Sequence, residues 1–159
     1  MSSGIDPWVK TLLLKAAEDE ASIQIDELPD GPFGFHAQQA VEKLIKALLS
    51  QLGIGYDYTH DVTKLAQQLN GVGENMPSVP ATLSELNQFA VIYRYDSIPE
   101  VAIPDRPAVI ETVRLIREHI VAASLPSPQL RSHLRYNRTK RLPARNRNSP
   151  VRRRVRRSC

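Results

Sequence analysis

Five polar residues share one side of a long apolar segment, and their types could support chemistry. Offsets of three and four residues return to the same side of a helix, which aligns Gln38, Gln39, Glu42, Lys43 and Lys46. We call this set the polar stripe. It can be a reaction site, a binding surface or the solvated side of a bundle. Glu42 and Lys46 have the acid-first i, i+4 order of a weak ion pair, so the residues alone favour a solvated face.

A run of basic residues near the end of the chain is the second candidate for function. Residues 119–159 contain 12 Lys and Arg and no acid: Arg131, Arg135, Arg138, Lys140, Arg141, Arg145, Arg147, Arg152, Arg153, Arg154, Arg156 and Arg157. A segment with so many positive charges can bind RNA or another nucleic acid, because binding releases counterions from the phosphates. Such binding carries no sequence specificity. The alternatives are an acidic partner surface, a contact with the acidic remainder of this chain, or an extension without function.

Apolar residues at helical spacing predict five helices that would position these side chains. The expected ranges are 7–22, 33–52, 60–70, 83–95 and 106–123. In the first helix we expect Asp6 as the N-cap and Trp8, Leu12, Leu13, Ala16 and Ala17 on the buried side. The segment 28–32, which contains two prolines and a glycine, predicts a break before the second helix.

Capping signals mark the later helices. Thr59 or His60 is the expected cap of the third helix, and Thr82 with Glu85 has the spacing of a capping box before the fourth. Asp105 is the expected cap of the fifth.

The chain should therefore be all-α. No strand-like alternation separates these segments, which predicts a four- to five-helix up-and-down antiparallel bundle over residues 1–125. Residues 126–159 should form a disordered, arginine-rich tail. Residues 1–118 hold 9 basic and 17 acidic residues, a net charge of −8, whereas the remainder carries +12.

Several classes of protein are disfavoured. No apolar run approaches the roughly 18 residues of a membrane span, and the start lacks the order of a secretory signal, so we expect a cytoplasmic protein with no membrane contact. The single cysteine, Cys159, permits no internal disulfide, and the four histidines are too dispersed for a metal site. We expect no cofactor.

Three segments together resemble a known family. FHAQQAVEKLIKA at 35–47, THDV at 59–62 and YRY at 93–95 are similar in order and spacing to the HEPN domain family, over roughly residues 7–123. The resemblance implies a helical bundle that is usually a homodimer. Members are often encoded beside a minimal nucleotidyltransferase as its toxin–antitoxin partner, and some are metal-independent ribonucleases.

The resemblance also implies a catalytic pair. Ribonuclease members carry an Arg-x(4–6)-His motif, which Arg114 and His119 match. Histidine can take the 2′-hydroxyl proton and arginine can stabilise the phosphorane. However, the apolar Leu115 follows the arginine, and the chain lacks the His-x-Tyr continuation of some toxins. Five residues turn a helix by about 500°, which separates the two side chains by about 140° unless a second copy supplies one of them.

His60 has two interpretations. With Thr59 and Asp61 it can belong to a helix start, or it can join a polar cluster with Glu42 and Arg94 that forms a buried ion pair or contacts a nucleotide phosphate. His36 is expected to pack near its helix start.

These observations favour a non-catalytic HEPN-domain partner of a minimal nucleotidyltransferase, with nucleotide or RNA binding. Residues expected to contact the nucleotide or the partner are Glu42, Lys43, Lys46, His60 and Arg94. The alternative is a metal-independent endoribonuclease that uses Arg114 and His119.

Overall fold

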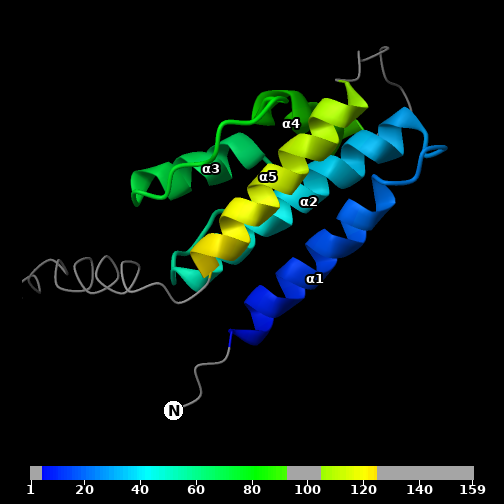
Figure 1. Ribbon diagram of the computed structural model, residues 1–159. Coiled ribbons are helices and arrows are strands. Elements are labelled where there is room, and N and C mark those ends of the chain that lie inside the picture. The colour runs from blue at the N-terminus through cyan, green and yellow to red at the C-terminus, as the bar shows by residue number, and fades with distance from the viewer. Residues whose placement is uncertain (1–4, 93–104, 125–159) are drawn as a thin grey trace, which may run out of the picture. The chain divides into compact units, whose positions relative to one another are not determined.

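The computed structural model describes residues 5–92 and 105–124, and these residues fold into five helices (Figure 1). The helices are α1 (Pro7–Ser22), α2 (Asp30–Gln51), α3 (Val62–Gly71), α4 (Leu83–Ile92) and α5 (Arg106–Ser124). No strand occurs within these ranges. The predicted all-α bundle is therefore confirmed.

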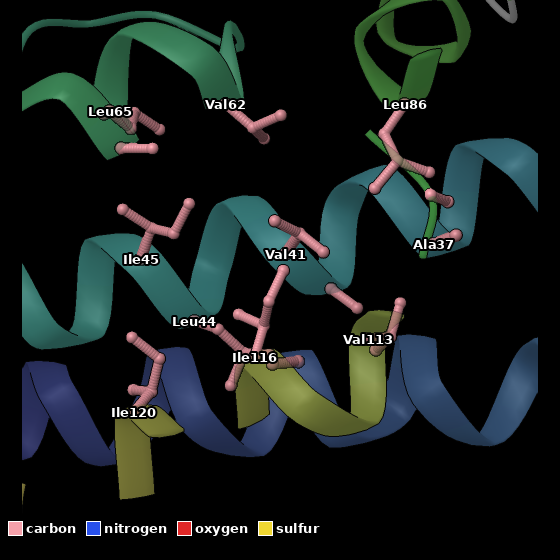
Figure 2. Packing of buried hydrophobic residues seen from close by; sticks show 14 of the residues in the cluster. Ala37, Val41, Leu44, Ile45, Val62, Leu65, Leu86, Val113, Ile116 and Ile120 are labelled. Carbon is pink, nitrogen blue, oxygen red and sulfur yellow. The ribbon is translucent and has the colours of Figure 1, made fainter. Parts of the chain in front are cut away.

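The long helix α2 forms the centre of the bundle, and all four other helices pack on it. Figure 2 shows Val62 and Leu65 of α3 on one side of α2 and Ile116 and Ile120 of α5 on the other. The α2 residues between them, such as Leu44, Ile45 and Leu48, are 0–1% exposed. Burying an aliphatic side chain of this size contributes about 1.5–3 kcal/mol, so α2 supplies much of the core.

The partners of α2 run in different directions. Late in α1, Asp19 contacts His36, and Trp8 at the other end of α1 contacts Tyr56 beyond the end of α2, so α1 and α2 are antiparallel. By contrast, α5 begins where α2 begins, with Arg106 beside Asp30. Figure 2 shows Val113, Ile116 and Ile120 following α2 in the same direction.

The break between the first two helices is shorter than the sequence predicts. Helix α2 begins at Asp30 rather than Phe33, with Pro29 at its N-cap. Pro32 falls in the first turn, where its missing N–H would have no partner in the helix anyway. The prediction treated both prolines as helix breakers, although one is compatible with a first turn and the other with a cap.

The buried side of α1 also differs from the prediction. Asp6 caps the helix as expected, with Oδ1 accepting from the N–H of Trp8 at 2.7 Å. However, Trp8 is 55% exposed and Ala17 is exposed, whereas Val9 is fully buried. The row Val9, Leu12, Ala16 continues to the buried Asp19. Because Asp19 is charged, the pattern of apolar residues alone did not identify this row as the buried side of α1.

The cap of α3 is Asp61, which corrects the expectation of Thr59 or His60. Asp61 Oδ1 accepts from the N–H groups of Thr63 at 3.0 Å and Lys64 at 3.2 Å. Asn87 of α4 reinforces this end: its Nδ2 donates to Asp61 Oδ1 at 2.7 Å, and its Oδ1 accepts from the N–H of Val62 at 2.8 Å. The two short helices are thus joined at the start of α3.

The capping box of α4 is confirmed. The N–H of Thr82 donates to Glu85 Oε2 at 2.7 Å, and the N–H of Glu85 donates to Thr82 Oγ1 at 3.2 Å. These hydrogen bonds hold the pKa of the Glu85 carboxyl below its ordinary value.

Arg106 fastens the first turn of α5 to the connection between α1 and α2. Its guanidinium donates to the carbonyls of Leu28 at 2.6 Å and Asp26 at 3.3 Å, and it pairs with the Asp30 carboxylate. The same group lies 4.6 Å from the ring centroid of Phe33.

Several predictions fall outside the described residues. These are the extension of the fourth helix to residue 95, the domain boundary at 125/126 and the arginine-rich tail. Within the described ranges, no helix combines the length and apolar character that crossing a membrane requires.

A close approach of α4 to α2 generates the first testable prediction. A Cβ added at Gly34 would lie 2.3 Å from the ring of Phe89, which is buried at 3% exposed. We expect Gly34→Ala to destabilise the chain by about 1–3 kcal/mol in urea unfolding, because the ring must move. Gly31→Ala is the matched control, since nothing lies within 4 Å of its added Cβ. Equal stabilities of the two variants would contradict this packing.

Candidate functional site

The carboxylate of Glu42 lies at the centre of the polar stripe and is only 4% exposed. It accepts hydrogen bonds from Lys46 Nζ at 2.7 Å, Gln38 Nε2 at 3.0 Å and Gln39 Nε2 at 3.2 Å. His60 Nδ1 lies 3.1 Å from the same carboxylate. A buried charge is tolerated when it is paired and hydrogen-bonded, and these four donors meet that requirement.

Gln38 connects this carboxylate to the segment before α3. Its side chain is fully buried, one helical turn before Glu42. Its Nε2 donates to Glu42 and also to the backbone carbonyl of His60 at 2.7 Å. The amide therefore fixes the entry to α3 relative to α2.

A second acid, Asp19 of α1, forms the other half of the network. Asp19 is 9% exposed and accepts from Lys43 Nζ at 2.5 Å, and His36 Nδ1 lies 2.8 Å from its Oδ1. Gln39 joins the two halves: its Nε2 donates to Gln38 Oε1 at 2.8 Å and its Oε1 accepts from Lys43 Nζ at 3.1 Å. One hydrogen-bonded network thus extends from α1 across α2 to the segment before α3.

The donors decide the ionisation of Glu42. Burial raises the pKa of this carboxyl, but the hydrogen bonds from Lys46 and Gln38, the charge of Lys46 and the contact with His60 lower it by more. The net pKa lies below the ordinary glutamate value. Glu42 is therefore an anion at neutral pH, and it holds its neighbours rather than acting as a proton donor.

The stripe is not the solvated face that its residue types favour. Gln38 and Glu42 are buried, Gln39 is half-buried, and the side chains of Lys46 and Lys43 are 15% and 23% exposed. The adjacent His60 is 43% exposed. At the Lys46 end, its Nζ lies 5.6 Å from the ring centroid of Tyr56, whose hydroxyl accepts from Trp8 Nε1 at 3.1 Å.

The two residues of the Arg-x4-His motif lie on α5 in different environments. The Arg114 guanidinium donates to Glu111 Oε1 and to Glu118 Oε1, each at 2.6 Å, and these acids hold its pKa above the ordinary value. His119 is partly buried, and within the described ranges its buried Nε2 has no hydrogen-bond partner. With about 140° between the two positions, one chain does not bring these groups together.

Other predicted and missed residues complete the site. Arg94 lies outside the described residues. Sequence analysis missed Asp19 as a site residue and gave His36 a packing role, although their contact ties α1 to α2. The sequence does contain a sign of this role, because Asp19 lies one helical turn after Ala16 on the buried side of α1. In the described part of the chain, no three histidine, cysteine or acidic side chains are placed to hold a metal ion.

Comparison with known proteins gives one match. The family model of the HEPN domain matches residues 9–124, which include all five helices except the first two residues of α1. Searches of curated proteins and of solved structures find no significant match.

The Glu42 network generates a stability prediction. Because the pKa of Glu42 is lower in the folded chain, its contribution is complete above the unfolded value of about 4.3 and is lost as the pH falls through the folded pKa. Glu42→Gln should cost about 3 kcal/mol in urea unfolding at pH 7, and the difference from wild type should shrink below about pH 4.

Glu18→Gln is the control for this experiment, because Glu18 pairs with Lys15 on the exposed side of α1 and its loss should leave stability unchanged. A Glu42→Gln variant as stable as wild type at pH 7 would show that the buried carboxylate does not hold the helices together.

Proposed function

The chain belongs to the HEPN domain family, and from this premise we propose that it is a non-catalytic partner of a minimal nucleotidyltransferase. The pair would form a toxin–antitoxin-like system in the cytoplasm, with this chain as a homodimer. The observation that carries the proposal is the environment of the Arg-x4-His motif. Arg114 is engaged by two acids of its own helix, and His119 turns toward the protein interior.

The outer edge of the polar stripe is the contact surface that we propose for the nucleotidyltransferase or its nucleotide. Lys43 and Lys46 of α2 and His60 of the segment before α3 have partly exposed side chains. Arg94 follows α4 in sequence. Glu42 would act behind them, because it fixes Lys46 and His60 through hydrogen bonds. The surface can bind a phosphate or carboxylate, since ammonium and imidazole N–H groups donate to such oxygens, and Lys43 and Lys46 can keep their ion pairs with Asp19 and Glu42.

Nucleic-acid affinity belongs, in this proposal, to the arginine-rich tail. Residues 5–92 and 105–124 contain 8 Lys and Arg against 15 Asp and Glu. Six of those eight cations form ion pairs with acids: Lys15, Lys43, Lys46, Arg106, Arg114 and Arg117. Because acids outnumber cations in these ranges, this part of the chain would repel a long polyanion, so the 12 basic residues after position 118 are the better source of attraction.

A metal-independent endoribonuclease is the second candidate. It is favoured by the exposed position of Arg114, whose side chain is 44% exposed on the same helix as His119. A substrate phosphate would have to displace Glu111 and Glu118 from the guanidinium. His119 would have to turn outward or act with Arg114 of a second copy.

Binding to the nucleotidyltransferase is the direct test of the proposal. We expect the chain to form a stable complex with a small nucleotidyltransferase encoded beside its own gene. Lys43→Gln should weaken that complex about tenfold, because it removes a charge-assisted contact. Circular dichroism must show that the variant stays folded, since Lys43 also pairs with Asp19. Lys15→Gln is the control, since Lys15 lies on α1 and pairs with Glu18. Absence of any complex in titration calorimetry would contradict the proposal.

A second experiment separates RNA binding from cleavage. Incubated with structured RNA in EDTA, the chain should bind but leave the RNA intact. Deletion of residues 127–159 should abolish salt-sensitive binding while the melting temperature stays unchanged, because the described helices end at Ser124. Cleavage that disappears in His119→Ala would contradict the non-catalytic proposal and favour the endoribonuclease. Unchanged RNA binding after the deletion would show that the tail is not the source of RNA affinity.

A further inference from the structure

Helix α1 carries a second apolar stripe on the side opposite its buried one. Leu14 is 58% exposed, Ala17 and Ala21 are exposed, and Ile25, just beyond the helix, is 50% exposed. The offsets of three and four residues align the first three on one side of the helix. We call these four residues the outer stripe. In Figure 1, α1 lies at the edge of the bundle, so this side is not enclosed by the other described helices.

The outer stripe has the shape of a helix-packing surface. Its two middle residues are alanines, which allow a neighbouring helix to approach closely. Its two ends are a leucine and an isoleucine, large enough to fill the space beside such a neighbour. A single exposed leucine would need no explanation, but an aligned apolar stripe on a helix of an otherwise acidic bundle is unusual.

Charges at the ends of the outer stripe identify the partner. Lys10 lies at the start of α1, and Asp26 and Glu27 lie beyond its end; all three are exposed. None of these side chains has an ion pair among the residues that the structure describes. A surface that is basic at one end and acidic at the other is complementary to itself when a copy is turned around.

We propose that a second copy of this chain binds the outer stripe, with the two α1 helices packed antiparallel about a twofold axis between Ala17 and Ala21. In that arrangement Leu14 of each copy meets Ile25 of the other. At 1.5 Å per residue of helix, Lys10 lies about 14 Å to one side of the axis, and Asp26 and Glu27 follow the end of α1 on the other side. Both apolar ends and both charged ends are then matched by one symmetry operation, as a twofold interface requires.

The inference rests on the homodimer of the proposed function and assigns its interface to α1. A single pair of helices buries less than the roughly 800 Å² per partner of a standard interface. The dimer should therefore be reversible, with a concentration-dependent mass.

Sedimentation velocity of the full chain over a range of concentrations tests the interface. Ala17→Arg places a charge near the proposed axis and should shift the monomer–dimer midpoint at least tenfold upward. Ala122→Arg is the matched control, because Ala122 is an exposed alanine on α5. Dimerisation that survives Ala17→Arg would overturn the inference and leave the homodimer itself intact, whereas a monomer at every concentration would overturn both.

A charge exchange tests the antiparallel orientation. Lys10→Glu and Glu27→Lys should each weaken the dimer several-fold, because each sets like charges against each other at both ends of a twofold interface. The double variant should recover the wild-type midpoint. Each change replaces an exposed residue, so folding should be unaffected, as circular dichroism would verify. A double variant no better than the single ones would overturn the antiparallel arrangement.

Discussion

An ionised carboxylate in the interior of the bundle is the constraint on which the rest of the structure depends. A charged group loses several kcal/mol of solvation on burial, and Glu42 is tolerated inside only because Lys46, Gln38, Gln39 and His60 surround it. Those partners come from α2 itself and from the segment before α3, so the requirement fixes both the rotation of α2 and the entry of α3. Asp19 imposes the same condition between α1 and α2 through His36 and Lys43.

This constraint bears on function because the same atoms cannot hold the bundle and also react freely. Lys43 is paired with Asp19, and Lys46 and His60 contact Glu42, yet their side chains stay partly exposed. Another molecule can reach these three residues only at that exposed edge. Arg114 is engaged in a similar way by Glu111 and Glu118. These two arrangements are the basis of our proposal that this HEPN-domain chain acts through its surfaces rather than through a reaction centre within one chain.

Sequence analysis predicted the number, order and approximate extent of the helices because apolar spacing and the Thr82–Glu85 capping box are local signals. It misjudged features that depend on partners distant in the chain. The two prolines before Phe33 look like helix breakers until the first turn of α2 is seen. Asp61 was missed as the cap of α3 because Thr59, two residues earlier, has a side chain that can also cap a helix. Glu42 is buried partly because His60, 18 residues later in the chain, contacts its carboxylate. Residue spacing within a single helix cannot predict such a contact.

The ionisation of Glu42 is the most direct test of the account, because every other feature of the network follows from it. An NMR titration that follows the side-chain carboxyl carbon of Glu42 measures its pKa in the folded chain. A pKa below the ordinary glutamate value is expected, since the combined donors outweigh the effect of burial. A value at or above the ordinary one would mean that the donors do not surround the carboxylate as described, and the explanation of how the helices are held together would be wrong.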